Sequence, residues 1–166
     1  MSTDEKAGFE AMYDQTAQRL MAYCLRHAGA QSAEDAVAET YAIAWRKRDQ
    51  LPPDPLPWLI VTARNTISAQ RRKDQRQGQT AQRLAPLEDL ATASPELTAV
   101  NRQQILQALS SLSEDDREAL LLIAWDGLST RDAARVLGTT PGALRVRIHR
   151  ARARLRTDDL QGAHHA

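Results

Sequence analysis

The stretch that decides the fold is LSTRDAARVLGTTPGALRVRIHRARARLR, which runs from Leu128 to Arg156. Ser129 is followed three residues later by Asp132, which is the spacing of a helix N-cap and its capping-box partner. Gly138 is typical of the end of this short helix. Thr140-Pro141 then favours a second helix, with threonine as its N-cap and proline at its first position. Two helices joined by so short a turn predict a helix-turn-helix.

The second helix separates an apolar face from a basic one. Leu144, Ile148, Ala151 and Leu155 recur at helical spacing and predict its buried face. The segment from Pro141 to Arg156 also holds six arginines and no acid. A guanidinium group can bind a guanine edge or a phosphate through two hydrogen bonds, so we expect a DNA-binding helix rather than a merely solvated one.

Position along this helix divides the expected DNA contacts. Residues near the N-terminus of a recognition helix contact bases, and later ones contact phosphates. We therefore expect Arg145, Val146 and His149 to face bases. The expected phosphate contacts are the backbone at Thr140 and the side chains of Arg147, Arg150, Arg152 and Arg154.

Helical spacing also recurs through the rest of the chain, and no stretch alternates as a strand would. One helix is expected to end near Gly29. A second is expected to start at Ser32 as N-cap, with Asp35 as capping-box partner, and to end near residue 48. Residues 49–57 hold four prolines and predict a loop. Further helices are expected at about 58–73, at about 96–110, and from an N-cap at Ser113 to a stop at Gly127.

The charge distribution suggests two nucleic-acid contacts. The net charge is only +1, but residues 64–83 hold six basic residues and one acid, while residues 84–126 hold eight acids and two bases. Residues 74–95 have weak periodicity and two prolines. We expect an all-α protein: a domain at 1–73, a flexible acidic linker at 74–95, and the helix-turn-helix domain at 96–160.

Several classes of function are disfavoured. The single cysteine, Cys24, excludes an internal disulfide and a multi-cysteine zinc site, and its apolar surroundings favour a buried core residue. The sequence has no Gly-rich phosphate loop, no His–Glu metal spacing on a helix and no clear nucleophile–base pair. The polar start and the lack of a long apolar run argue against a signal peptide and a membrane span. We expect a cytoplasmic protein that is not an enzyme and needs no metal or cofactor.

Three segments together resemble a known family. Residues 128–156, with the preceding ALSSLSEDDREALLLIAWDGLS, look like region 4 of a bacterial RNA polymerase sigma factor of the extracytoplasmic-function group. AEDAVAETYAIAW resembles that group's region 2 helix, and PWLIVTARNTISAQRRK resembles its promoter-melting segment. Ala38 stands where the group usually has Gln, and Ala143-Leu144 where Thr-Val is commoner.

The resemblance implies a specificity subunit of RNA polymerase. Region 4 would bind the minus-thirty-five promoter element and the flap of the β subunit. In region 2, Glu34, Asp35 and Glu39 would bind the β′ coiled coil. A loop before the promoter-melting helix would capture a flipped base of the minus-ten element, with Trp58 either bracing that loop or anchoring the core. Implied contacts there are Arg64, Asn65, Arg71 and Arg72, and an anti-sigma factor is the implied inhibitor.

A different class of function remains open from the residues alone. A conventional helix-turn-helix regulator would carry the same C-terminal segment, with an N-terminal half that dimerises or senses a ligand. Such a regulator would bind duplex DNA tightly without polymerase.

Overall fold

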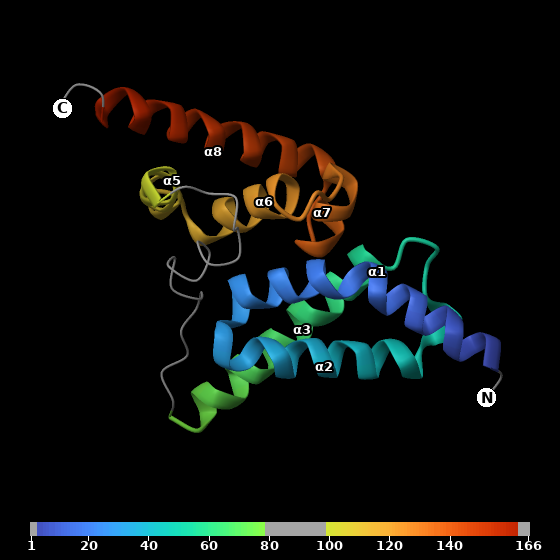
Figure 1. Ribbon diagram of the computed structural model, residues 1–166. Coiled ribbons are helices and arrows are strands. Elements are labelled where there is room, and N and C mark those ends of the chain that lie inside the picture. The colour runs from blue at the N-terminus through green and yellow to red at the C-terminus, as the bar shows by residue number, and fades with distance from the viewer. Residues whose placement is uncertain (1–2, 79–98, 163–166) are drawn as a thin grey trace. The chain divides into compact units, whose positions relative to one another are not determined.

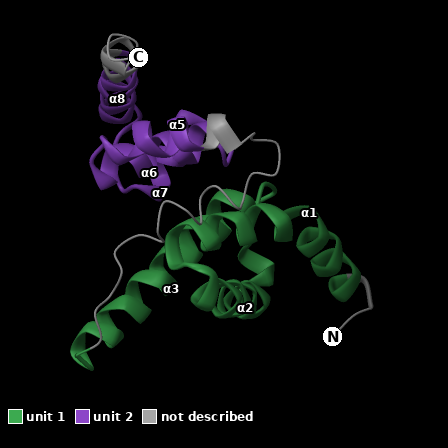
Figure 2. Cartoon of the chain, turned by 60° about the vertical axis from the view of Figure 1, so that its left-hand side comes forward, with its two compact units in different colours: residues 1–89 green, residues 90–166 purple. Residues whose placement is uncertain are grey.

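Helices make up the part of the chain that the structure describes. The computed structural model describes the backbone of residues 3–78 and 99–162, and those ranges contain no strand, so the all-α prediction is confirmed. The chain divides into two units, residues 1–89 and 90–166 (Figures 1 and 2). Most of the predicted linker, residues 79–95, lies outside the described residues.

Unit 1 is built from three long helices and a short 3-10 turn. They are α1 (Thr3–Ala28), α2 (Ala30–Arg46), η1 (Arg48–Gln50) and α3 (Leu56–Arg76). Each of α2 and α3 buries an apolar stripe, with Val37, Tyr41 and Ala44 on α2 and Leu59, Ala63 and Ile67 on α3.

An aromatic cluster joins α1 to α2 near the start of α1. Phe9 packs edge-on against Trp45, with ring centroids 4.9 Å apart. Tyr13 is 45% exposed, because its ring covers Tyr41 (centroids 4.7 Å apart) from the outside. The Tyr41 hydroxyl lies 2.8 Å from the Thr16 hydroxyl in a buried hydrogen bond. Packing and a satisfied polar pair therefore fix α1 on α2.

The start of α2 differs from the prediction. Gly29 is the N-cap, with φ of 78°, and its carbonyl accepts hydrogen bonds from the N–H groups of Ser32 and Ala33. A glycine adopts this positive φ without strain, so the chain turns in one residue and the helix resumes at once. The expected Ser32 N-cap with Asp35 as capping-box partner is therefore wrong, because both residues lie exposed inside α2.

The proline-rich segment is shorter than predicted. Residues 48–50 form η1, and α3 begins at Leu56, with Pro57 in its first turn. Proline is tolerated there because the N–H group that it lacks would have no partner within the helix. At its other end α3 continues to Arg76, so residues 74–76, expected in the linker, are helical.

Cys24 is confirmed as a core residue of unit 1. Its side chain is fully buried and unpaired with any other cysteine. Burial, opposed in part by the nearby charge of Arg26, raises the pKa of the Cys24 thiol to about 12. The thiol therefore stays protonated at neutral pH and packs as a small apolar group.

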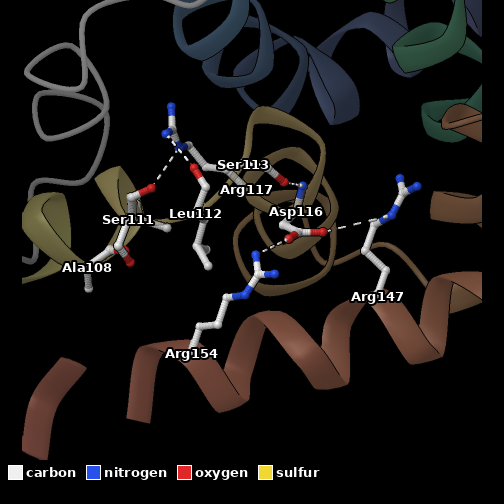
Figure 3. A network of polar contacts seen from close by, with 9 residues as sticks. Ala108, Ser111, Leu112, Ser113, Asp116, Arg117, Arg147 and Arg154 are labelled. Atoms are coloured by element: carbon white, nitrogen blue, oxygen red, sulfur yellow. Dashed lines mark hydrogen bonds and ion pairs between the residues drawn. The ribbon is translucent and has the colours of Figure 1, made fainter. Parts of the chain in front are cut away.

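Unit 2 contains four described helices around a leucine-rich core. They are α5 (Ala99–Ser110), α6 (Glu114–Ala124), α7 (Thr130–Val136) and α8 (Pro141–Gly162). The predicted Ser113 N-cap is confirmed, since its Oγ accepts the N–H of Asp116 at 3.2 Å. Arg117 donates to the carbonyl oxygens of Leu109 (2.9 Å) and Leu112 (3.1 Å) (Figure 3). It therefore supplies hydrogen-bond partners to a carbonyl group in the last turn of α5 and to one in the connection to α6.

Candidate nucleic-acid interface

The α7–α8 pair forms the predicted helix-turn-helix. Ser129 Oγ accepts the N–H of Asp132 at 3.1 Å and donates to its carboxylate at 2.7 Å, which confirms the N-cap. Ala133 and Ala134 are buried, with 0% and 1% of their surface exposed, so the two helices can cross closely. Gly138, with φ of 63°, makes the turn between them.

The start of α8 is also as predicted. Thr140 Oγ1 accepts the N–H of Ala143 at 3.2 Å, which makes Thr140 the N-cap, and Pro141 is the first helical residue. Leu144, Ile148 and Ala151 are buried against α6 and α7, while Leu155 is half-buried. This stripe fixes the rotation of α8 about its axis, and so decides which side chains face outward.

The outward surface of α8 combines one apolar residue with several cations. Val146 is 50% exposed and lies opposite the buried stripe, and its methyl groups can neither donate nor accept a hydrogen bond. His149 and Arg150 are exposed beside it. Val146 and His149 were predicted to face bases and Arg150 to contact a phosphate, and these roles in binding stay predictions.

The arginines of α8 lie on two different flanks. On one flank, a hollow of about 310 Å³ is lined by Arg145, His149, Arg152 and Arg156, with Ile123 and Thr130 also on its wall. On the other flank, Arg147 and Arg154 face the carboxylate of Asp116 on α6 (Figure 3). Sequence spacing indicated the two flanks, but the position of Asp116 opposite one of them depends on how α6 packs.

The residues expected at the minus-ten element do not share one surface. Asn65 is exposed and lines a groove of about 730 Å³ between α2 and α3. Arg64 and Arg71 are half-buried, and the Arg71 guanidinium donates to the backbone carbonyl of His27 on α1. Arg72 is exposed. Of these four, Asn65 alone lines the α2–α3 groove.

Basic residues omitted from the predicted site line the same groove as Asn65. They are Lys47 at the end of α2, and Lys73 and Arg76 at the end of α3. Asn65, Ala69 and Lys73 are four residues apart, so this shared face was available from the sequence. Trp58 also lines the groove and is only partly buried, so it is not solely a core anchor.

The acids expected at the polymerase are exposed on α2. Glu34, Asp35 and Glu39 all face outward, and Glu39 lies 3.5 Å from Arg46 in an exposed ion pair. Such a pair contributes little stability, so Glu39 can exchange it for a basic partner.

Within the described ranges, no three His, Cys, Asp or Glu side chains gather as metal ligands would. None of the described helices is long and apolar enough to cross a membrane.

Comparisons with known proteins match both units separately. A family model described as Sigma-70 region 2 matches residues 12–77, and one described as Sigma-70, region 4 matches residues 102–155. A relative from Mycobacterium tuberculosis, named ECF RNA polymerase sigma factor SigL, is 34% identical over 154 residues, which cover 89% of this chain and 86% of the relative.

Two solved structures are similar over nearly the whole chain. The sigma factor RpoE of Bartonella quintana, solved with the anti-sigma factor NepR, has a TM-score of 0.63 and 29% identity, over 94% of this chain and 96% of that one. CnrH, solved with the cytosolic domain of CnrY, has a TM-score of 0.59 and 25% identity, over 95% of this chain and 90% of that one.

Proposed function

We propose a division of labour for this chain, which belongs to the extracytoplasmic-function (ECF) group of RNA polymerase sigma factors. As such a factor it directs core RNA polymerase to promoters. In the proposed division, unit 1 binds core polymerase and the opened minus-ten strand, and unit 2 binds the minus-thirty-five element as duplex. The observation that carries this is the pairing of an arginine-lined helix-turn-helix with a separate helical unit that has its own basic groove.

In unit 2, the exposed end of α8 would enter the major groove. Arg145, Val146 and His149 would contact base edges, and Arg150 and Arg152 would contact phosphates. Thr140 would offer the N-terminal N–H groups of α8 to a phosphate. The β flap of polymerase would bind elsewhere on this unit.

In unit 1, two hollows suit an opened strand. The α2–α3 groove, whose charged lining is Lys47, Lys73, Arg76 and the acid Glu39, would hold the strand's phosphates on its three basic side chains beside Asn65, with Trp58 offering an aromatic face for a base. A second hollow of about 400 Å³ lies between the start of α1 and the proline loop, lined by Phe9, Met12, Arg48, Leu51, Pro52, Pro53 and Pro55. It is the proposed receptor for a flipped base, whose unstacking costs a few kcal/mol.

The exposed acids of α2 would dock on the β′ coiled coil, whose basic side chains would replace Arg46 beside Glu39. The chain would act in the cytoplasm as a binding subunit and not as an enzyme. Both similar solved structures hold a partner, named for one of them as an anti-sigma factor, so we also propose an anti-sigma protein that covers these surfaces.

Reconstitution tests the proposal. The purified chain and core polymerase are incubated with a promoter library, and transcription start sites are mapped. We expect initiation only when the chain is present, from promoters that share an upstream and a minus-ten element. Tight binding to duplex DNA without polymerase, together with no chain-dependent initiation, would instead support a conventional helix-turn-helix regulator.

A variant then tests the assignment of base contacts. Arg145→Ala should remove the preference at one upstream base, at a cost of about 1–3 kcal/mol. Uniform weakening across all sequences, accompanied by a shallower salt dependence, would make Arg145 a phosphate contact. Arg135→Ala is the control, because Arg135 is exposed on α7 and paired within its own helix to Asp132.

A further inference from the structure

Two of the arginines assigned to DNA face one carboxylate of their own unit. Arg154 Nη1 lies 3.2 Å from Asp116 Oδ2, and Arg147 Nε lies 3.9 Å from Asp116 Oδ1 (Figure 3). The two arginines are seven residues apart, or about two helical turns, so they lie on the same side of α8. Since Asp116 belongs to α6, both contacts tie the recognition helix to its neighbour.

Asp116 is itself firmly placed. Its backbone N–H donates to the Ser113 N-cap, and it lies in the first turn of α6, where the helix dipole stabilises a carboxylate. The Asp116 side chain is only 16% exposed, whereas those of Arg147 and Arg154 are 37% and 59% exposed. A partly buried carboxylate is destabilised when it loses the cations beside it, and the negative phosphates of bound DNA would destabilise it further.

The other flank of α8 offers a matched pair. Arg145 and Arg152 are also seven residues apart, but they line the 310 Å³ hollow on the side away from Asp116. The same helix therefore presents two equally spaced pairs of arginines, of which one faces an internal carboxylate.

We propose that Asp116 is a positioning residue that keeps Arg147 and Arg154 on α6 while DNA is bound. These two arginines then fix the direction of the recognition helix and neutralise no phosphate. The phosphate contacts of α8 come from its other arginines, among them Arg152. The proposal rests on the proposed function only in requiring that α8 binds duplex DNA.

The dependence of affinity on salt separates the two kinds of arginine. Binding of the holoenzyme, reconstituted from the full chain and core polymerase, to a duplex that carries the mapped upstream element is measured by fluorescence anisotropy between about 50 and 200 mM salt. Each phosphate contact contributes about 0.9 to the slope of log affinity against log salt. We expect Arg152→Gln to lower that slope by about 0.9, whereas Arg147→Gln and Arg154→Gln leave it unchanged.

The two variants should still bind less tightly. We expect a loss of about two- to fivefold at every salt concentration, the size of a surface ion pair. Asp116→Asn should release both arginines and steepen the slope, by up to about 0.9 for each. Thermal melting of each variant reports any loss of folding, which would change the active fraction but not the slope.

Each contrary result has its own meaning. If Arg147→Gln or Arg154→Gln lowers the slope as much as Arg152→Gln does, these arginines bind phosphate and the inference is wrong. An unchanged slope in Asp116→Asn also overturns it. If Arg152→Gln too leaves the slope unchanged, the assignment of α8 to DNA fails instead.

Discussion

At the scale of the residue, the pKa of His27 is the least expected property of unit 1. It is 6% exposed, and its ring lies against Tyr23 with centroids 4.3 Å apart. Burial lowers the pKa of His27 from 6.5 to about 3, and the charges of Arg26, Arg71 and Arg64 add to the effect. The folded unit therefore accepts only the neutral imidazole. The sequence around His27 shows only Arg26 beside it, because the burial of the ring and the approach of Arg64 and Arg71 on α3 depend on tertiary packing.

This burial predicts a pH-dependent stability. The unfolded chain binds a proton at His27 below about pH 6.5, whereas the folded chain does not until about pH 3. Unfolding therefore takes up a proton between these values, and stability falls as the pH falls. From pH 7.5 to 5.5 the contribution of His27 should drop by about 1.4 kcal/mol, about half the limit for two pH units, because the unfolded imidazole takes up its proton only around pH 6.5.

Urea unfolding of the parent and of His27→Phe, at both pH values, isolates the contribution of His27 to the free energy of unfolding. Phenylalanine keeps a ring against Tyr23 but cannot be protonated. We expect the parent to lose about 1.4 kcal/mol more than the variant on acidification. Equal losses in the two proteins would show that His27 is not held neutral in the fold.

At the scale of the element, helix starts were predictable where a side chain caps the helix. Ser113, Ser129 and Thr140 each accept an N–H three residues on, as their sequence spacing indicated. Ser32 has the same spacing to Asp35 but no such bond, because Gly29 had already started α2. A capping box is a local sequence pattern, and it does not mark the start of a helix when a turn just before it has already started that helix.

This difference predicts that a serine-to-alanine substitution has unequal effects at the two positions. Ser129→Ala removes a hydrogen-bonding N-cap of α7 and should destabilise unit 2 by about 1 kcal/mol. Ser32→Ala lies exposed inside α2 and should change the stability of unit 1 by less than about 0.5 kcal/mol, since alanine favours a helix interior. Calorimetric melting of the full chain checks both. A destabilisation by Ser32→Ala equal to that by Ser129→Ala would contradict the structure of the α1–α2 junction.

The candidate site was predictable in part at this scale. The helical repeat of α8 was enough to place Val146 outward and Leu144 inward, as observed. It was not enough to distinguish Arg147 from Arg152, because the carboxylate that separates them arrives from α6. In unit 1, likewise, Lys47 joins the groove with Asn65 only through the packing of α2 on α3.

At the scale of the whole molecule, the two units carry separate basic surfaces. The proposed duplex-binding surface lies on α8, and the proposed strand-binding groove lies between α2 and α3. A promoter that is opened at one element and closed at the other offers both substrates at once. If both units bind one promoter, their contributions to the free energy of open-complex formation should combine in the same initiation complex.

Additivity of two substitutions tests this combined action. Arg152→Gln weakens the proposed duplex contact, and Asn65→Ala the proposed strand contact. Because the two residues lie in units with separate cores, their costs in open-complex formation by reconstituted holoenzyme should add, to within about 0.3–0.5 kcal/mol. The fold-losses of the single variants should thus multiply in the double variant.

A promoter truncated just upstream of the minus-ten element supplies the control. On this promoter Arg152→Gln should lose most of its effect, because the duplex whose phosphate it contacts is missing, while Asn65→Ala should keep its full effect at the intact minus-ten element. If the double variant forms open complexes on the intact promoter as well as the more impaired single variant does, the two surfaces do not act in the same complex. The division of labour between the units would then be wrong, even if each surface binds DNA by itself.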